Sequence, residues 1–174
     1  MRTKIRQFLP CILCIAGILF SSFAPAPPPG IYYFSPIPAI GVGPNGLPTK
    51  KINVTPYCCP SVAIEITGIG PVVENDFQWV NIPLSLPEGV IKAVRVCYGT
   101  KNKAYISQTR LTVMTTPDKA TVMLDDPTNQ TSPAPTCYDS KANVSVNGTI
   151  TLSLKVVIPP GGSITIGSVQ IDMQ

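Results

Sequence analysis

The stretch "GTITLSLKVVI", residues 148–158, is the clearest indication of the fold. Its large apolar residues stand at every second position: Ile150, Leu152, Leu154, Val156 and Ile158. Side chains alternate between the two faces of a β-strand, so this spacing predicts a strand with one buried face and one polar face.

Other β-type runs flank this stretch from Ser61 onward: "SVAIEIT" (61–67), "FQWVNIPLSL" (77–86), "VIKAVRVCY" (90–98), "YISQTRLTVM" (105–114), "KATVMLDD" (119–126) and "SITIGSVQIDM" (163–173). Turn sequences separate them: "LPEG" (86–89), "GTKNK" (99–103), "TTPD" (115–118) and "PPGG" (159–162). No run of ten or more residues carries a helical apolar stripe. The pattern predicts an all-β antiparallel sandwich, jelly-roll or immunoglobulin-like, with seven or eight strands.

Two of these runs lead to predictions about individual residues. In the run 119–126, we expect Ala120, Val122 and Leu124 to face inward. In the last run the apolar phase changes at Gly167. One extra residue in a strand restores the apolar face, so this change predicts a β-bulge.

The N-terminus has the parts of a secretory signal peptide. Arg2, Lys4 and Arg6 precede an apolar stretch at 9–20, and small residues follow it. We expect residues 1–26 to be removed on export, which places the protein outside the cell, at the cell surface or in a periplasm.

The segment that follows is rich in proline, with ten of the 20 prolines of the chain between 25 and 60. Proline fixes φ and lacks a backbone N–H, so we expect an extended tail or linker over 27–56. Part of its apolar sequence "IYYFSPIPAI" (31–40) is expected to lie against the domain or a partner. The β-sandwich domain is expected over 57–174.

Charge and composition exclude several functions. Cleavage would remove three of the 13 basic residues and none of the 9 acidic ones, lowering the formal net charge from +4 to +1. The mature chain has no cluster of Lys and Arg, which argues against nucleic-acid binding. The chain has no histidine, which excludes Ser-His-Asp and Cys-His catalysis. We expect no metal site and no small-molecule cofactor.

The mature chain would hold four cysteines: Cys58, Cys59, Cys97 and Cys137. Export favours disulfides, and four cysteines allow three pairings. One arrangement joins Cys97 to Cys137, while the adjacent pair closes on itself or stays reduced. In the other, Cys58 and Cys59 each take one distant partner. We favour the Cys97–Cys137 bridge, with Cys137 in a loop (126–140) that has no strand of its own.

Trp79 and Phe77 are the candidate ligand-binding residues. Both fall on the strand face opposite Val80 and Ile82. One interpretation is core, edge or tail packing, because aromatic side chains dominate buried area. The other is a stacking platform for sugar rings, joined by Tyr98, Tyr105 or Tyr138.

The segment from "IPLSLPEGVIKAVRVCY" (82–98) through "PTCYDS" (135–140) to "GSVQIDM" (167–173) resembles small exported bacterial β-sandwich domains of unknown function. The resemblance spans 77–174. It implies a β-sandwich and an exported protein, and it transfers no functional residues.

These observations predict a non-catalytic exported module that acts in interaction or structure, with a cell-surface protein or a glycan as partner. The first alternative is a carbohydrate-binding module that uses exposed aromatic residues. The second is a small hydrolase that uses two of the nine carboxylates. The adjacent Asp125 and Asp126 are expected to serve a turn rather than a Ca²⁺ site.

Overall fold

The computed structural model describes residues 29–36, 38–42, 52–57, 63–68, 77–116 and 119–174. Within these ranges the secondary structure consists of β-strands alone. They are β1 (Gly30–Phe34), β2 (Ile40–Val42), β3 (Ile52–Pro56), β4 (Ile64–Gly68), β5 (Gln78–Lys101), β6 (Tyr105–Thr116), β7 (Lys119–Asp126), β8 (Thr136–Val157) and β9 (Ser163–Met173). All pairings between these strands are antiparallel, as expected. The all-β prediction is confirmed, with nine strands in place of seven or eight.

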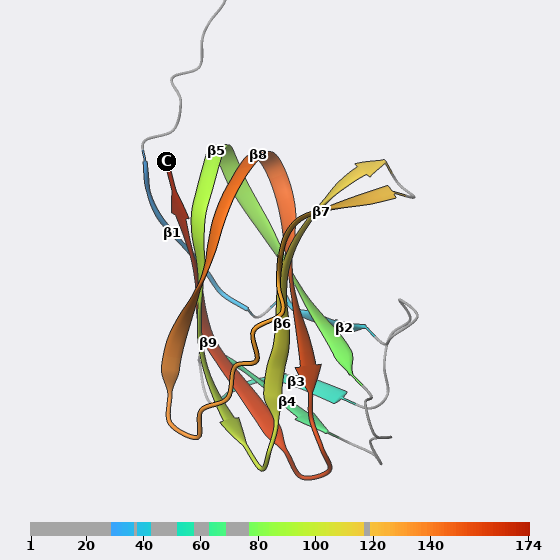
Figure 1. The fold of residues 1–174 in the computed structure, drawn as a ribbon. Helices are drawn as coiled ribbons and strands as arrows, with labels where there is room; N and C mark the ends of the chain where they lie inside the picture. Colours follow the sequence, from blue (N-terminus) through green and yellow to red (C-terminus); the bar gives the residue numbers. More distant parts are fainter. Residues whose placement is uncertain (1–28, 37, 43–51, 58–62, 69–76, 117–118) are drawn as a thin grey trace, which may run out of the picture.

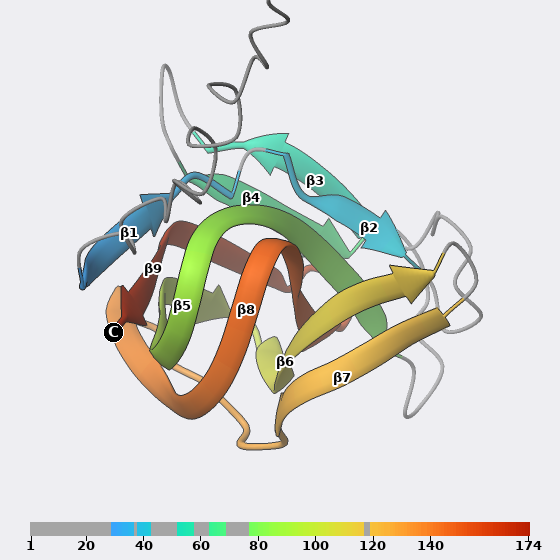
Figure 2. The same ribbon diagram turned by 90° about the horizontal axis from the view of Figure 1, so that it is seen from above.

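The strands form two packed layers joined by two long strands. β5 and β8 run up one layer and arch over into the other (Figure 1; Figure 2 shows both arches from above). Layer A contains β2, the first half of β5, the second half of β8, β6 and β7. Layer B contains the remaining halves of β5 and β8 together with β9, β1, β4 and β3.

The arch in β5 lies where the sequence predicts a turn between two strands, and that prediction is wrong. The chain continues as one strand of 24 residues with a register shift between Leu86 and Gly89. Pro87 has no N–H to donate, so a bulge accommodates it without losing a ladder bond. Opposite Leu86, Gly148 has a φ of 94°, a conformation that glycine adopts at little cost. The bulge and this glycine together let the two strands bend.

The core lies between the two layers, and each layer contributes inward-facing aliphatic side chains to it. The largest fully buried ones are Ile64, Ile66, Ile82, Leu84, Ile91, Ile106, Leu111, Ile150, Leu152, Leu154, Ile164 and Ile166. Burying one such side chain contributes about 1.5–3 kcal/mol. The alternation predicted for 148–158 is confirmed, since all five of its even-numbered apolar residues from 150 to 158 are buried.

Two finer expectations have different outcomes. The bulge predicted at Gly167 is present, because β9 slips by one residue against β5 between the pairs Cys97–Ser168 and Tyr98–Ile166. The inward orientation predicted for β7 holds only for Leu124, which is partly buried and packs against the core, while Ala120 and Val122 are exposed. The β6–β7 hairpin projects beyond the sandwich, and no opposing layer formed by the described residues covers it (Figure 1).

The proline-rich segment contributes three strands instead of forming a separate tail. β1 pairs with β9, β2 with the start of β5, and β3 with β4. The apolar part 31–40 thus lies partly against the domain, which begins before the boundary expected at Tyr57. The expected signal peptide, 1–26, lies outside the described residues. Over the ranges that the structure describes, there is no helix with the length and apolar character needed to span a bilayer.

Candidate functional site

The outer face of layer A gathers aromatic, charged and amide side chains, and we call it the Trp79 face. Trp79 is the cross-strand neighbour of Lys155, and Asn81 of Ser153. On the next strand, Arg110 pairs with Ser153. The remaining members are Phe77, which precedes β5, Gln108 on β6 and Asp125 on β7. The alternation of β5 places this face opposite the core. Of the two interpretations of Phe77 and Trp79, packing inside the core does not hold.

The two aromatic rings of this face contact each other, and each also contacts a cationic side chain. Phe77 and Trp79 meet edge to face, with 6.2 Å between ring centroids and 85° between planes. The Arg110 guanidinium lies 4.9 Å from the centroid of Trp79. The Lys155 ammonium lies 3.9 Å from the centroid of Phe77. Each cation–π contact at such a half-exposed site is worth about 0.5–1 kcal/mol, so both rings have a fixed orientation.

The Arg110 guanidinium, which contacts the Trp79 ring, also binds the carboxylate of Asp125. The Nε and Nη2 atoms of Arg110 donate to the two carboxylate oxygens of Asp125 at 3.3 and 3.1 Å. Gln108 donates its amide to the same carboxylate. The hydrogen bond from Arg110 holds the pKa of Asp125 below its ordinary value. Arg110 is therefore held between a ring and a carboxylate that is ionised at neutral pH.

One neutral pair completes the face. The Ser153 hydroxyl donates to the Asn81 side-chain carbonyl at 2.7 Å. This bond joins β8 to β5 and fixes the orientation of the Asn81 amide, which lies on the same face of β5 as Trp79, two residues along the strand. The Trp79 face thus presents an aromatic surface bordered by a cation and an amide, all positioned by neighbouring strands.

Tyr98 does not belong to this surface, which corrects the expectation that it joins the platform. Its side chain is 5% exposed and packs edge to face on Tyr138, with 5.5 Å between centroids. The Tyr138 hydroxyl and the Thr109 hydroxyl share a 2.6 Å hydrogen bond. Burial raises the pKa of Tyr138 well above its ordinary value. Tyr98 is a core residue, since it has the inward phase of β5, and Tyr138 is partly buried and packs against the core.

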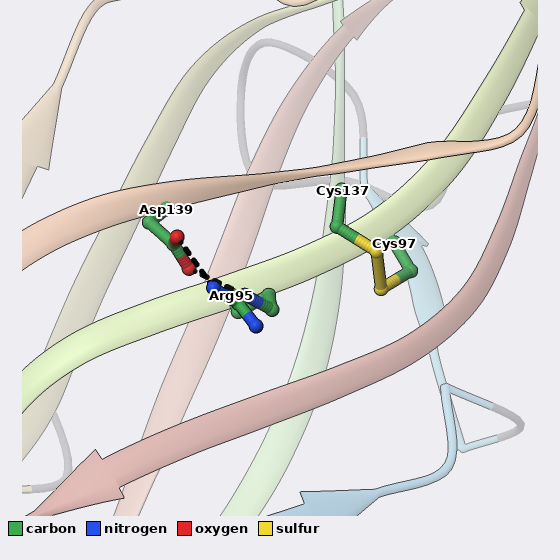
Figure 3. Close-up of a disulfide and its surroundings, with 4 residues drawn as sticks. All are labelled: Arg95, Cys97, Cys137 and Asp139. Carbon is green, nitrogen blue, oxygen red and sulfur yellow. Dashed lines mark hydrogen bonds and ion pairs between the residues drawn. A yellow bond between two sulfur atoms is a disulfide. The ribbon is translucent and has the colours of Figure 1, made fainter.

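The disulfide between Cys97 and Cys137 is present, as favoured from the sequence. The two cysteines are direct cross-strand neighbours on the outer face of layer B (Figure 3). Cys137 lies on β8 and not in a loop, because β8 begins at Thr136. Cys58 and Cys59 lie outside the described residues.

An ion pair stands two positions along from the disulfide on the same strands. Arg95 Nε and Nη2 donate to the carboxylate oxygens of Asp139 at 2.7 and 2.8 Å (Figure 3). The hydrogen bond from Arg95 lowers the pKa of Asp139. Both side chains are exposed, so the pair contributes little to stability.

A groove with a volume of about 340 Å³ opens beside the disulfide, on the outer face of layer B. Its lining residues are Tyr57, Cys97, Tyr98, Gly99, Thr100, Lys101, Pro133, Pro135, Thr136, Cys137, Thr165 and Gly167. Volumes of roughly 300–1,000 Å³ are typical of small-ligand sites. The sequence offered no sign of this groove, because its walls come from segments distant along the chain.

Three of the acidic side chains already have partners. Asp125 is bound by Arg110, Asp139 by Arg95, and Asp126 accepts from the Ser140 hydroxyl at 2.6 Å. Among the described residues, no group of three or more Cys, Asp or Glu side chains is suited to hold a metal ion.

Comparison with known proteins identifies neither a family nor a curated relative: no family model and no curated protein matches the chain. Several solved structures share part of its β-architecture. TmCBM61 in complex with beta-1,4-galactotriose matches at 13% identity and a TM-score of 0.49, over 79% of this chain and 89% of that chain. A CBM4 structure matches at 13% identity and a TM-score of 0.46, over 80% of this chain and 94% of that chain. At such identity and superposition, no ligand is carried over to this chain.

Proposed function

We propose that the protein is an exported, non-catalytic module that binds a glycan through the Trp79 face. The observation that carries the proposal is the fixed arrangement of Trp79, Arg110 and Asn81 on an outer sheet face. Export is supported by the signal-like N-terminus and by the Cys97–Cys137 disulfide, since disulfides persist in oxidising compartments.

The chemistry of the Trp79 face suits a sugar ring. An aromatic side chain offers an apolar surface for the C–H face of the ring, while a few placed polar groups bind the hydroxyls. The Arg110 guanidinium and the Asn81 amide supply donors and acceptors next to Trp79. Their orientations are fixed before a ligand arrives, which lowers the entropic cost of binding.

A role without catalysis fits the carboxylates better than a hydrolase does. Glycoside hydrolysis needs two carboxyl groups facing each other across a cleft, one of them with a raised pKa. Here the pKa values of Asp125 and Asp139 are lowered by arginine partners, and the two side chains lie on opposite layers.

The test compares variants of Trp79 on immobilised polysaccharides, including a β-1,4-linked galactan. Trp79→Ala should weaken retention about tenfold or more, because it removes the ring at the centre of the site. Trp79→Phe should retain part of the binding. Tyr33→Ala is the matched control, since Tyr33 is 69% exposed on the outer face of layer B and its loss should leave retention unchanged.

Circular dichroism and the unfolding midpoint must stay unchanged in Trp79→Ala for this result to count. Retention equal to that of the wild type, with an intact fold, would refute glycan binding at this face. Loss of the fold would assign Trp79 to packing, and Arg110→Gln, which leaves the ring in place, would then test the site.

A second candidate function is contact with a cell-surface protein through the β6–β7 hairpin. Met114 is 59% exposed and Val122 is 48% exposed, and both stand on the projecting hairpin. Exposed apolar side chains grouped in this way often mark an interaction surface. If this surface binds the partner, Met114→Gln combined with Val122→Thr should abolish cross-linking to a host cell-surface fraction, while Trp79→Ala should not.

A further inference from the structure

The groove beside the disulfide exists because two glycines interrupt the outer face of layer B. Gly99 on β5 and Gly167 at the bulge of β9 both line it. A Cβ atom added to Gly99 would meet only the backbone of Pro135, at 3.9 Å, an ordinary contact distance. Neither glycine has a positive φ, so their backbones do not require glycine. The absence of side chains at these two positions leaves the space of the groove, although the backbone conformation there would also suit other residues.

The walls of the groove are rings and flat apolar surfaces. Pro133, Pro135 and the disulfide line it. Of its two aromatic members, Tyr57 is 43% exposed and Tyr98 is 5% exposed. Thr136 and Thr165, which carry hydroxyl groups, also line it. A shallow site of this composition suits a ligand that has both an apolar face and hydroxyl groups.

One end of the groove is positively charged. Lys101 lines the groove, and a second hollow that shares Thr100, Lys101 and Pro133 with it also includes Lys103. Both lysines are exposed, and no carboxylate of the described residues forms an ion pair with either. No acidic side chain lines either hollow in the part of the chain that the structure describes.

The turn that carries these lysines has a defined conformation. Asn102 and Lys103 have φ values of 51° and 64°, which form the left-handed turn between β5 and β6. The Asn102 amide donates to the carbonyl of Gly161 at 2.7 Å, which ties this turn to the loop before β9. The two ammonium groups are thus presented from a braced turn and not from a free loop.

We propose that this groove binds an acidic sugar residue, such as a hexuronate of a polysaccharide, with its carboxylate at Lys101 and Lys103. The sugar ring would lie against Tyr57 and the prolines. The charge of the two lysines selects an anion, and the ring-lined hollow selects a sugar over a flexible acidic peptide. This site lies on layer B, so it is separate from the Trp79 face and does not depend on the function proposed for that face.

The test measures binding of hexagalacturonate by calorimetry at low salt, with a neutral galactohexaose as the comparison ligand. Lys101→Gln should weaken hexagalacturonate binding about threefold to fivefold, the size expected for an exposed ion pair. Gly99→Val should reduce it at least tenfold, because the isopropyl group occupies the groove while suiting a strand. Lys141→Gln is the charge-matched control, since Lys141 is exposed on β8 away from the groove, and it should bind as the wild type does.

Each remaining outcome overturns the proposal. Equal binding of the neutral hexaose would show that the lysines do not select an anion. Equal weakening by Lys141→Gln would show non-specific attraction to a polyanion. Tighter binding of a glutamate-rich peptide would assign the groove to acidic proteins, and no binding of hexagalacturonate would remove the site. Trp79→Ala should leave hexagalacturonate binding unchanged, so failure at one face is distinguishable from failure at the other.

Discussion

The two outer faces of the sandwich share the strands β5 and β8 but are built in opposite ways. On the Trp79 face, large side chains fill the surface and hold one another: Arg110 lies between the ring of Trp79 and the carboxylate of Asp125. On the other face, Gly99 and Gly167 leave a hollow bordered by a disulfide. The first face owes its shape to contacts between large side chains, and the second owes its hollow to the lack of side chains at the two glycines.

This difference shows how one strand serves two sites. β5 carries Trp79 on its first half and Cys97 on its second, and the arch between the halves sends them to opposite layers. A substitution that acts on one face should therefore leave the chemistry of the other unchanged, provided that the shared strands stay folded. The predictions below test that independence.

The largest effect is expected from removal of the disulfide. Cys97→Ala combined with Cys137→Ala should lower the free energy of unfolding by about 3 kcal/mol, because the bridge closes a loop of 40 residues. The change removes one border of the groove, so hexagalacturonate binding should fall. Urea denaturation measures the first effect and calorimetry the second.

The control for this double variant is the state of the Trp79 face. Tryptophan emission of the folded protein should match that of the wild type, because Trp79 is the only tryptophan in the chain and lies on the other layer. A shifted emission maximum below the unfolding transition would mean that the disulfide also positions the first half of β5, and the two faces would not be independent.

An intermediate effect is expected at Tyr138, which packs against the core between the two layers. Tyr138→Phe removes the hydroxyl that bonds to the Thr109 hydroxyl across the core. A buried polar group left without a partner costs about 1–3 kcal/mol, so the free energy of unfolding should fall by that amount. Glycan retention and hexagalacturonate binding should stay as in the wild type. Unchanged stability would show that water reaches Thr109 and that this part of the core is open.

The sequence predicted what depends on local alternation. The inward phase of 148–158 and the bulge at Gly167 both follow from a period of two and from the point where it slips. The same period put Trp79 on the face opposite Val80 and Ile82, but it left open whether that face is buried. The Cys97–Cys137 bridge was favoured over the other arrangement, and it is present.

The errors arose where tertiary contacts override a local signal. "LPEG" has the composition of a turn, yet the pairing of β5 with β8 on both sides carries the strand through it. The run 119–126 alternates, but most of it projects beyond the core, so Ala120 and Val122 remain exposed and only Leu124 packs against the core. Residues 30–34, which lie within the proline-rich segment but contain no proline, form a strand because they pair with β9. No local pattern brings Arg110 to Trp79 or Pro135 to Gly99.

The smallest effect is expected from loss of the two arginine–aspartate ion pairs, one of which lies on each face. The pKa values of Asp125 and Asp139 are lowered in the folded state by Arg110 and Arg95. Each pair therefore contributes stability above the unfolded pKa of about 3.9, and this contribution is lost as the pH falls through the lower folded pKa. Arg110→Gln and Arg95→Gln should each make the loss of stability below about pH 4 shallower.

The two variants should differ in what else they change. Arg110 covers the ring of Trp79, so Arg110→Gln should also increase quenching of tryptophan emission by acrylamide at neutral pH. Arg95 has no aromatic ring beneath it in the contacts of the described residues, so Arg95→Gln should leave quenching unchanged. Equal quenching in both variants would show that Arg110 does not shield the ring. The arginine would then be only half of an ion pair, as on the opposite face, and not part of a fixed binding surface.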